Sequence, residues 1–210
     1  MKSKIRKSLD LLMAVFMIAL MSYQATGNLF HEAAGVMLML LFLIHNILNR
    51  KWYRAIPKGK YSFYRGALLA VNIFVLFCML TAMGTGIYLS QTVFAPLLGM
   101  REAYLIRPWH VVAGAWGTVF VSVHGGMHIQ IPKEKKGKVF VMIGGGFLAA
   151  AGLWAFFAMD MPDRMMVRDA GMYWRYSKEL LFGANAVVMA FFTAVGAFLG
   201  TYLKKKGRSK

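Results

Sequence analysis

The sequence has 210 residues, of which 59% are hydrophobic, and a mean hydropathy of +0.53, values typical of a membrane protein. The formal net charge is +17, but the basic residues fall in short runs between long apolar stretches, a positive-inside pattern that argues against nucleic-acid binding. The single cysteine, Cys78, excludes an internal disulfide, a cysteine-ligated iron–sulfur cluster and the covalent attachment of a c-type haem.

Six apolar segments follow one another along the chain, each close to the roughly 17–25 residues that a membrane helix needs. They cover residues 9–26, 31–49, 66–89, 108–130, 138–158 and 180–203. We therefore predict an all-α protein that forms one membrane domain of about six transmembrane helices. In this prediction residues 1–130 form a four-helix core, and residues 131–210 add two helices and a basic tail.

The distribution of Lys and Arg predicts the orientation of these helices. Nineteen of the 25 basic residues lie before the first segment, in the loops 50–65 and 133–138, and after Tyr202. In a protein with six spans these regions all face the cytoplasm, and so do both termini. The first segment resembles a signal peptide with a weak cleavage sequence at residues 25–27. We expect it to be retained, because cleavage would leave the bundle one helix short.

The second and fourth segments share a histidine pattern. It reads His-x-x-x-Gly with a second histidine fourteen residues after the first, and it occurs at His31, Gly35 and His45 and again at His110, Gly114 and His124. Fourteen residues bring two side chains to the same face of a helix, about 21 Å apart along the axis. Each helix therefore has one histidine near each edge of a hydrocarbon core that is about 30 Å thick.

A histidine within an apolar span usually has a partner such as a metal. The two helices run in the same direction, so His31 comes level with His110 at the outer side and His45 with His124 at the inner side. This arrangement predicts two haem b groups between the second and fourth helices, each held by two histidines. The alternative is that the four histidines serve packing or a proton relay.

Several neighbouring residues suit a haem site. Gly35 and Gly114, one turn from the outer histidines, leave room for a flat macrocycle. Haem propionates need cationic or hydrogen-bonding partners, and we expect Arg107, with Arg101, to supply them on the outer side and Arg50 on the inner side.

Two polar residues next to the histidines have open roles. His128, one turn after His124, is an alternative inner ligand, although only His124 reproduces the spacing of fourteen. Glu32 either takes a proton from a quinol or is a solvated acid at the start of its helix, and we favour the second role.

The last two segments have the features of packing helices. Gly196 and Gly200 form a Gly-x-x-x-Gly motif that favours close helix contact. Between these segments, the outer stretch 159–179 mixes charges with aromatic residues, which are either interfacial anchors or a docking or quinone-facing surface.

A set of short motifs between about residues 5 and 130 points to a known family. These are His31-Glu32-x-x-Gly35, His45 with Asn49 and Trp52, Gly86-Ile87-x-x-Ser90, Arg107 before His110, and His124-x-Gly126-x-His128. In these motifs the chain resembles the flavinylation-associated cytochromes, a bacterial membrane family first catalogued as a domain of unknown function. The resemblance implies a haem protein of the bacterial cytoplasmic membrane that passes electrons toward extracytoplasmic proteins carrying covalent flavin (FMN).

We therefore predict a di-haem b-type cytochrome that moves electrons from quinol or a cytoplasmic donor to an extracytoplasmic flavoprotein. The sequence has no nucleotide-binding Gly-rich loop, so the flavin would belong to a separate partner. Membrane lipid is an expected contact and nucleic acid is not. One alternative is a cytochrome b subunit of a quinone-linked dehydrogenase or a ferric-reductase-like system. Another, of a different class, is a transporter with a histidine proton relay.

Overall fold

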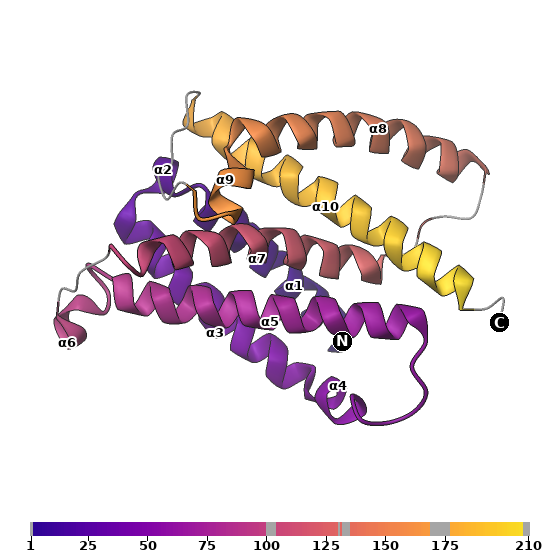
Figure 1. Cartoon of the computed structure of the whole chain (residues 1–210), viewed down its shortest axis with the longest axis horizontal. Helices are drawn as coiled ribbons and strands as arrows, with labels where there is room; N and C mark the ends of the chain where they lie inside the picture. Colours follow the sequence, from indigo (N-terminus) through magenta and orange to yellow (C-terminus); the bar gives the residue numbers. More distant parts are fainter. Residues whose placement is uncertain (1, 100–103, 130, 132–134, 169–176, 208–210) are drawn as a thin grey trace.

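The computed structural model describes residues 2–99, 104–129, 131, 135–168 and 177–207, and all regular secondary structure within them is helical (Figure 1). The long helices are α1 (Lys2–Met21), α3 (Asn28–Leu48), α5 (Phe63–Leu89), α7 (Arg107–His128), α8 (Lys135–Ala158) and α10 (Lys178–Lys206). The short helices are α2 (Tyr23–Thr26), α4 (Arg50–Ala55), α6 (Ala95–Leu98) and α9 (Met161–Met165). The predicted all-α class is confirmed. Arg101 and the aromatic residues at 173–176 lie outside the described residues.

Local sequence signals explain where several helices begin. The Ser62 hydroxyl accepts a hydrogen bond from the Arg65 N–H at 3.2 Å, and the Ser177 hydroxyl accepts one from the Leu180 N–H at 3.3 Å. Each serine thereby satisfies one of the first-turn donors that lack a partner within the helix. Helix α7 has a proline in its first turn, where no backbone donor is needed and the fixed φ suits the helix.

The first predicted segment, 9–26, is not a single helix. Helix α1 ends at Met21, and the chain turns at Ser22 before the short helix α2. Ser22 is completely buried; its hydroxyl donates to the Ile18 carbonyl at 2.8 Å and accepts from the Asn185 amide at 3.1 Å. This link to α10, 163 residues further along the chain, holds the turn in place, and no periodicity of the local sequence predicts it.

Helix α7 lies at the centre of the bundle and packs against α5, α9 and α10 (Figure 1). Along the seam with α10, three glycines bring the two backbones together. A Cβ atom would meet backbone of the other helix at 3.0 Å or less at Gly126, Gly196 and Gly200. The close contact predicted for Gly196 and Gly200 is therefore confirmed, and glycine is needed there because of the short distance between backbones.

The surface and composition of the long helices suit a membrane. All six predicted segments are helical, and α3, α5 and α10 are long and apolar enough to cross a bilayer. Large apolar side chains on these helices point outward, such as Phe77 and Phe198, which are 68% and 70% exposed. In Figure 1 the α4–α5 connection and the C-terminal end of α10 lie at one end of the bundle, and α2, α6 and α9 lie at the other. Lipid contact is the simplest explanation for such exposed apolar surface.

Candidate functional site

The structure brings together the two histidines predicted for the outer site. His31 on α3 and His110 on α7 have ring centroids 6.0 Å apart and ring planes that differ by 73°. We refer to these two residues as the outer pair. They lie 79 positions apart in the sequence, and both are partly buried.

Each ring of the outer pair is oriented through its Nδ1 atom. His31 Nδ1 lies 3.1 Å from the Leu20 carbonyl oxygen, and His110 Nδ1 lies 3.0 Å from both the Ala82 carbonyl oxygen and the Thr85 hydroxyl. Thr85 donates its own proton to the Thr81 carbonyl at 2.6 Å, so its oxygen accepts from His110. A carbonyl oxygen only accepts, which places the ring proton on Nδ1 of both histidines and leaves the Nε2 lone pairs for a ligand.

A cavity of about 260 Å³ lies at the outer pair. This volume is just under the range of about 300–1,000 Å³ that is usual for small-molecule sites. The walls come mainly from apolar residues of α1, α3, α5 and α7, with a few polar groups among them. A b-type haem is held by ligation and packing alone, and His31 and His110 line a mostly apolar cavity with which such a group is compatible.

Glycines shape the walls of this cavity, and two of them are the predicted Gly35 and Gly114. A Cβ atom at Gly35 or Gly114 would meet other protein atoms only at ordinary contact distances, 3.9 and 3.7 Å. At Gly86 on α5, by contrast, a Cβ would lie 3.2 Å from His110 Cε1. Gly86 therefore lets the His110 ring lie against α5, which gives a physical reason for the glycine in the motif Gly86-Ile87-x-x-Ser90.

Glu32 is not the solvated acid that we favoured from the sequence. Its carboxylate accepts six hydrogen bonds, at 2.6–3.0 Å, from the Asn28 amide, the Ser90 and Thr92 hydroxyls, and the backbone N–H groups of Gln91, Thr92 and Val93. The loop between α5 and α6 is thereby fastened to the start of α3, directly above the outer pair. Sequence reasoning placed Glu32 at a helix start but missed this loop, because five of the six donors lie about 60 residues further along the chain.

Of the predicted propionate partners that the structure describes, Arg107 and Arg50, only Arg107 lies at the cavity. Arg107 is exposed at its outer end but contributes to the cavity wall. Arg50, at the start of α4, is exposed, and no hydrogen bond or ion pair in the described structure links it to a histidine. A second arginine at the cavity, Arg164, was not singled out in the sequence, and it is almost completely buried.

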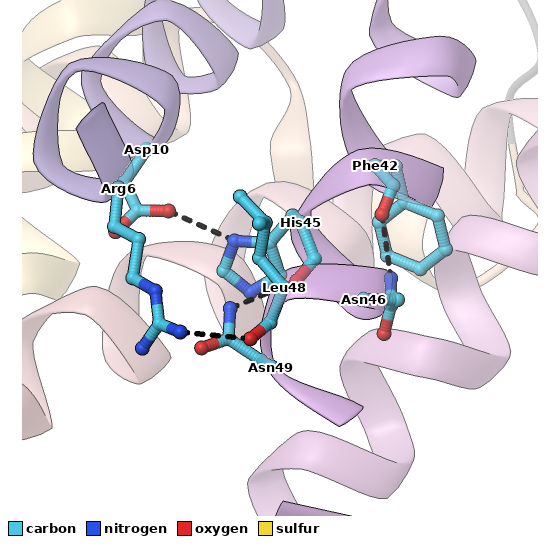
Figure 2. A network of polar contacts seen from close by, with 7 residues as sticks. All are labelled: Arg6, Asp10, Phe42, His45, Asn46, Leu48 and Asn49. Carbon is cyan, nitrogen blue, oxygen red and sulfur yellow. Dashed lines mark hydrogen bonds and ion pairs between the residues drawn. The ribbon is translucent and has the colours of Figure 1, made fainter. Parts of the chain in front are cut away.

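The inner histidines are held in a different way. His45 Nδ1 is 2.8 Å from the Asp10 carboxylate, and Figure 2 shows the ring turned toward α1. His124 Nδ1 is 2.6 Å from the Asn72 side-chain oxygen. His124 also makes an edge contact with His128, with ring centroids 5.0 Å apart. Within the described residues, no ring contact joins His45 to His124, and we refer to the three histidines as the inner set.

A second set of contacts ties α1 to the inner end of α3. The Arg6 guanidinium donates to the Leu48 carbonyl at 2.9 Å, next to the contact between Asp10 and His45 (Figure 2). Asp10 is 53% exposed and His45 is 26% exposed. Asp10 and Asn72 were not singled out in the sequence. Because a metal-binding histidine needs an acceptor for its other ring N–H, the signal to look for was a polar residue level with each histidine.

The spacing of the outer pair is compatible with one metal ion between the two rings. Two imidazoles that bind one metal ion from opposite sides, with bonds of about 2 Å and ~1 Å more to each ring centre, have ring centres about 6 Å apart. The observed 6.0 Å agrees. Within the part of the chain that the structure describes, no three His, Cys, Asp or Glu residues gather as a metal site, but haem iron needs only two protein ligands.

No family model, curated protein or solved structure matches this chain. The resemblance to the flavinylation-associated cytochromes therefore depends on the sequence motifs alone.

Proposed function

We propose that this chain is a membrane cytochrome with six transmembrane helices that holds two b haems and passes electrons between the two sides of the membrane. The outer haem would be bound by His31 and His110, and the inner haem by His45 and His124. The observation that carries this proposal is the outer pair, whose rings lie 6.0 Å apart at a mostly apolar cavity with both Nδ1 atoms at backbone carbonyls.

The residues of the chain would supply binding, orientation and exclusion of water. A bound haem supplies one-electron chemistry at its iron. Hydrogen bonds to backbone carbonyls fix the tautomer and orientation of His31 and His110 and raise their basicity as ligands. The apolar walls keep water from the site, and Gly35 and Gly114 provide space against the helix backbones.

Three features support six spans with both termini in the cytoplasm. Each of the six apolar segments overlaps a helix of 20 residues or more, although α1 ends within the first segment. The basic 50–65 loop and the basic C-terminal tail lie at the same end of the bundle (Figure 1). That end would face the cytoplasm under the positive-inside rule. Reporter fusions after Arg65, Lys138 and Lys210 should report cytoplasm, whereas an external tail would contradict the six-span topology.

The partner proposed for the outer side is an extracytoplasmic flavoprotein with covalent FMN, and the donor is quinol or a cytoplasmic-side protein. This part of the proposal rests on the resemblance of residues 5–130 and on the lack of a nucleotide-binding Gly-rich loop in the sequence.

Haem content of the purified protein tests the proposal. A pyridine haemochrome assay should find two b haems per fully loaded chain, and His31→Ala or His110→Ala should remove one spectral component and leave the other. Arg168→Gln is the control, because Arg168 is exposed and does not line the cavity. A fully expressed protein that contains no haem would contradict the cytochrome and favour the histidine proton relay.

A further inference from the structure

Part of the wall of the outer cavity is a loop rather than a long helix. Residues 90–94 join α5 to α6 at the end of the bundle where α6 lies, and we refer to them as the outer loop (Figure 1). Ser90, Gln91 and Phe94 line the cavity. Ser90 is buried and Gln91 is exposed, so the loop lies between the cavity and the surface of the protein. Movement of this loop would open the cavity while the long helices stay in place.

Side chains satisfy the backbone of the outer loop. The N–H groups of Gln91, Thr92 and Val93 donate to the Glu32 carboxylate at 2.8–3.0 Å, and the Phe94 N–H donates to the Ser90 hydroxyl at 2.8 Å. Four consecutive backbone donors therefore depend on side chains, and three of them depend on one carboxylate. A backbone donor that is buried without a partner is costly. Without this carboxylate the loop would have to turn these groups toward water.

Hydroxyl groups of the outer loop bind the same carboxylate. Ser90 and Thr92 donate to Glu32 Oε2 at 2.6 and 2.7 Å, so five hydrogen bonds from the loop converge on one side chain. Hydrogen bonds to an ionised acceptor are roughly twice as strong as those between neutral groups. Glu32 directly follows His31 in α3, and the residue that fastens the loop is therefore next to a proposed haem ligand.

We propose that Glu32 keeps the outer loop closed over the cavity, and that the outer haem enters and leaves the protein past this loop. The inference rests on the proposed function and extends it, because it gives the outer site a route and a residue that controls the route. The rest of the wall comes mainly from long helices, whose displacement would expose packed apolar surface. The loop opens when its contacts to one side chain break, and local opening follows the least stable contacts of a structure. Glu32 is thus a positioning residue that acts through the loop.

Hydrogen exchange of the outer loop tests the fastening, with or without haem in the protein. Glu32→Gln keeps the size of the side chain, but its amide nitrogen, in the place of either carboxylate oxygen, faces at least one backbone N–H of the loop. The amides of Gln91, Thr92 and Val93 should exchange about 10- to 100-fold faster in the variant, as for the loss of hydrogen bonds to a charged group. Glu179→Gln is the matched control, because it makes the same change in the first turn of α10, where the side chain is exposed and does not line the cavity. Unchanged exchange in Glu32→Gln would overturn the proposal.

A milder variant tests the same contact from the side of the loop, even if Glu32→Gln does not fold. Thr92→Val keeps the shape of the side chain and removes one hydroxyl donor to Glu32 Oε2. It should accelerate exchange of the loop, but less than Glu32→Gln does. The double variant should exchange little faster than Glu32→Gln, because the hydroxyl has already lost its charged acceptor. Fully additive effects would mean that the two residues act separately, and would overturn the proposal.

Release of haem tests the route. Transfer of haem from the solubilised full-length protein to excess apomyoglobin measures dissociation of each haem, and the outer haem is the component that His31→Ala removes. Glu32→Gln should release the outer haem about 10- to 100-fold faster, in line with its effect on the loop, and the inner haem at the wild-type rate.

Two results would overturn the route and leave the cytochrome intact. Equal acceleration of both haems would indicate a general loss of stability, and an unchanged outer rate despite faster exchange of the loop would indicate another route. A wild-type protein without haem would overturn the proposed function together with the route, whereas hydrogen exchange would still decide whether Glu32 closes the cavity.

Discussion

The two ends of the helix pair α3 and α7 hold their histidines by different means. At the outer end, Leu20 and Ala82 supply backbone carbonyls as acceptors for the two Nδ1 atoms, and the two rings make an edge contact. At the inner end, the acceptors are side-chain oxygens of Asp10 and Asn72. The outer pair also adjoins a cavity, whereas His45 at the inner end is turned toward α1 (Figure 2).

The histidine rings of the outer pair are therefore oriented by the backbone, whereas the rings of His45 and His124 are oriented by individual side chains. A backbone carbonyl remains when its residue is substituted, so the outer tautomers are set by the helix positions. A carboxylate or amide partner is lost with one mutation, and a carboxylate also makes the imidazole more basic and so affects the potential of a bound metal. We therefore expect substitutions of hydrogen-bond partners to affect the proposed inner haem much more than the proposed outer haem.

The largest expected effect concerns the identity of the inner ligand. His124→Ala should abolish the six-coordinate low-spin spectrum of the inner haem, and His128→Ala should leave it low-spin. His124 lies as far along α7 from His110 as His45 lies along α3 from His31, so parallel helices bring that pair level. His128 lies one turn further, about 6 Å along the axis.

Optical and electron paramagnetic resonance spectra of the two variants check this prediction. In both variants the outer haem should keep its spectrum, because its ligands and their acceptors are unchanged. A low-spin inner haem that survives in His124→Ala and disappears in His128→Ala would reverse the assignment.

A second, smaller effect is expected from the inner hydrogen-bond partner. Asn72→Leu removes the acceptor 2.6 Å from His124 Nδ1, and loss of such a partner typically weakens metal binding about 10- to 100-fold. Haem dissociation rates of the inner component measure the change. Asn46→Leu is the matched control, because Asn46 also lies in the inner half, but its side chain bonds to Phe42 and Tyr53 rather than to a histidine ring. Equal losses in the two variants would contradict a specific role for Asn72.

The sequence predicted the parts of the molecule that have a local period. The fourteen-residue spacing placed His31 and His110 on faces that meet in the structure, and hydropathy located the long helices. The break at Ser22 and the buried Arg164 were missed, because both depend on contacts between segments far apart in the chain. Ser22 is held by Asn185 of α10, and the position of Arg164 depends on the burial of Met159 and Met161.

The inner half also depends on the seam between α7 and α10, which gives a third prediction. At Gly126 an added Cβ would overlap the Thr193 carbonyl oxygen, whereas at Gly125 nothing lies within 4 Å. Gly126→Ala should therefore destabilise the protein by about 1–3 kcal/mol, the usual range for overpacking. Gly125→Ala should be neutral or slightly stabilising, since alanine is favoured over glycine in a helix by about 1 kcal/mol.

Thermal unfolding of the two alanine variants in detergent measures this difference. The pair is closely matched, because the residues are adjacent in the same helix and receive the same side chain. Similar melting temperatures would show that α7 and α10 can separate slightly with little loss of stability. In that case the contact between the two helices does not fix the position of His124 along the bundle.

The smallest effect is expected at Thr85, and it tests the outer end directly. The His110 Nδ1–H has two acceptors at 3.0 Å, the Thr85 hydroxyl and the Ala82 carbonyl. Thr85→Val removes the first and keeps the shape of the side chain, but the carbonyl still accepts the proton and still fixes the tautomer. A neutral hydrogen bond contributes ~1 kcal/mol, so the outer haem should dissociate no more than about fivefold faster. That change is smaller than the one expected for Asn72→Leu at the inner end. A loss as large as that of Asn72→Leu would mean that side chains orient both ends of the helix pair, and the distinction between them would fail.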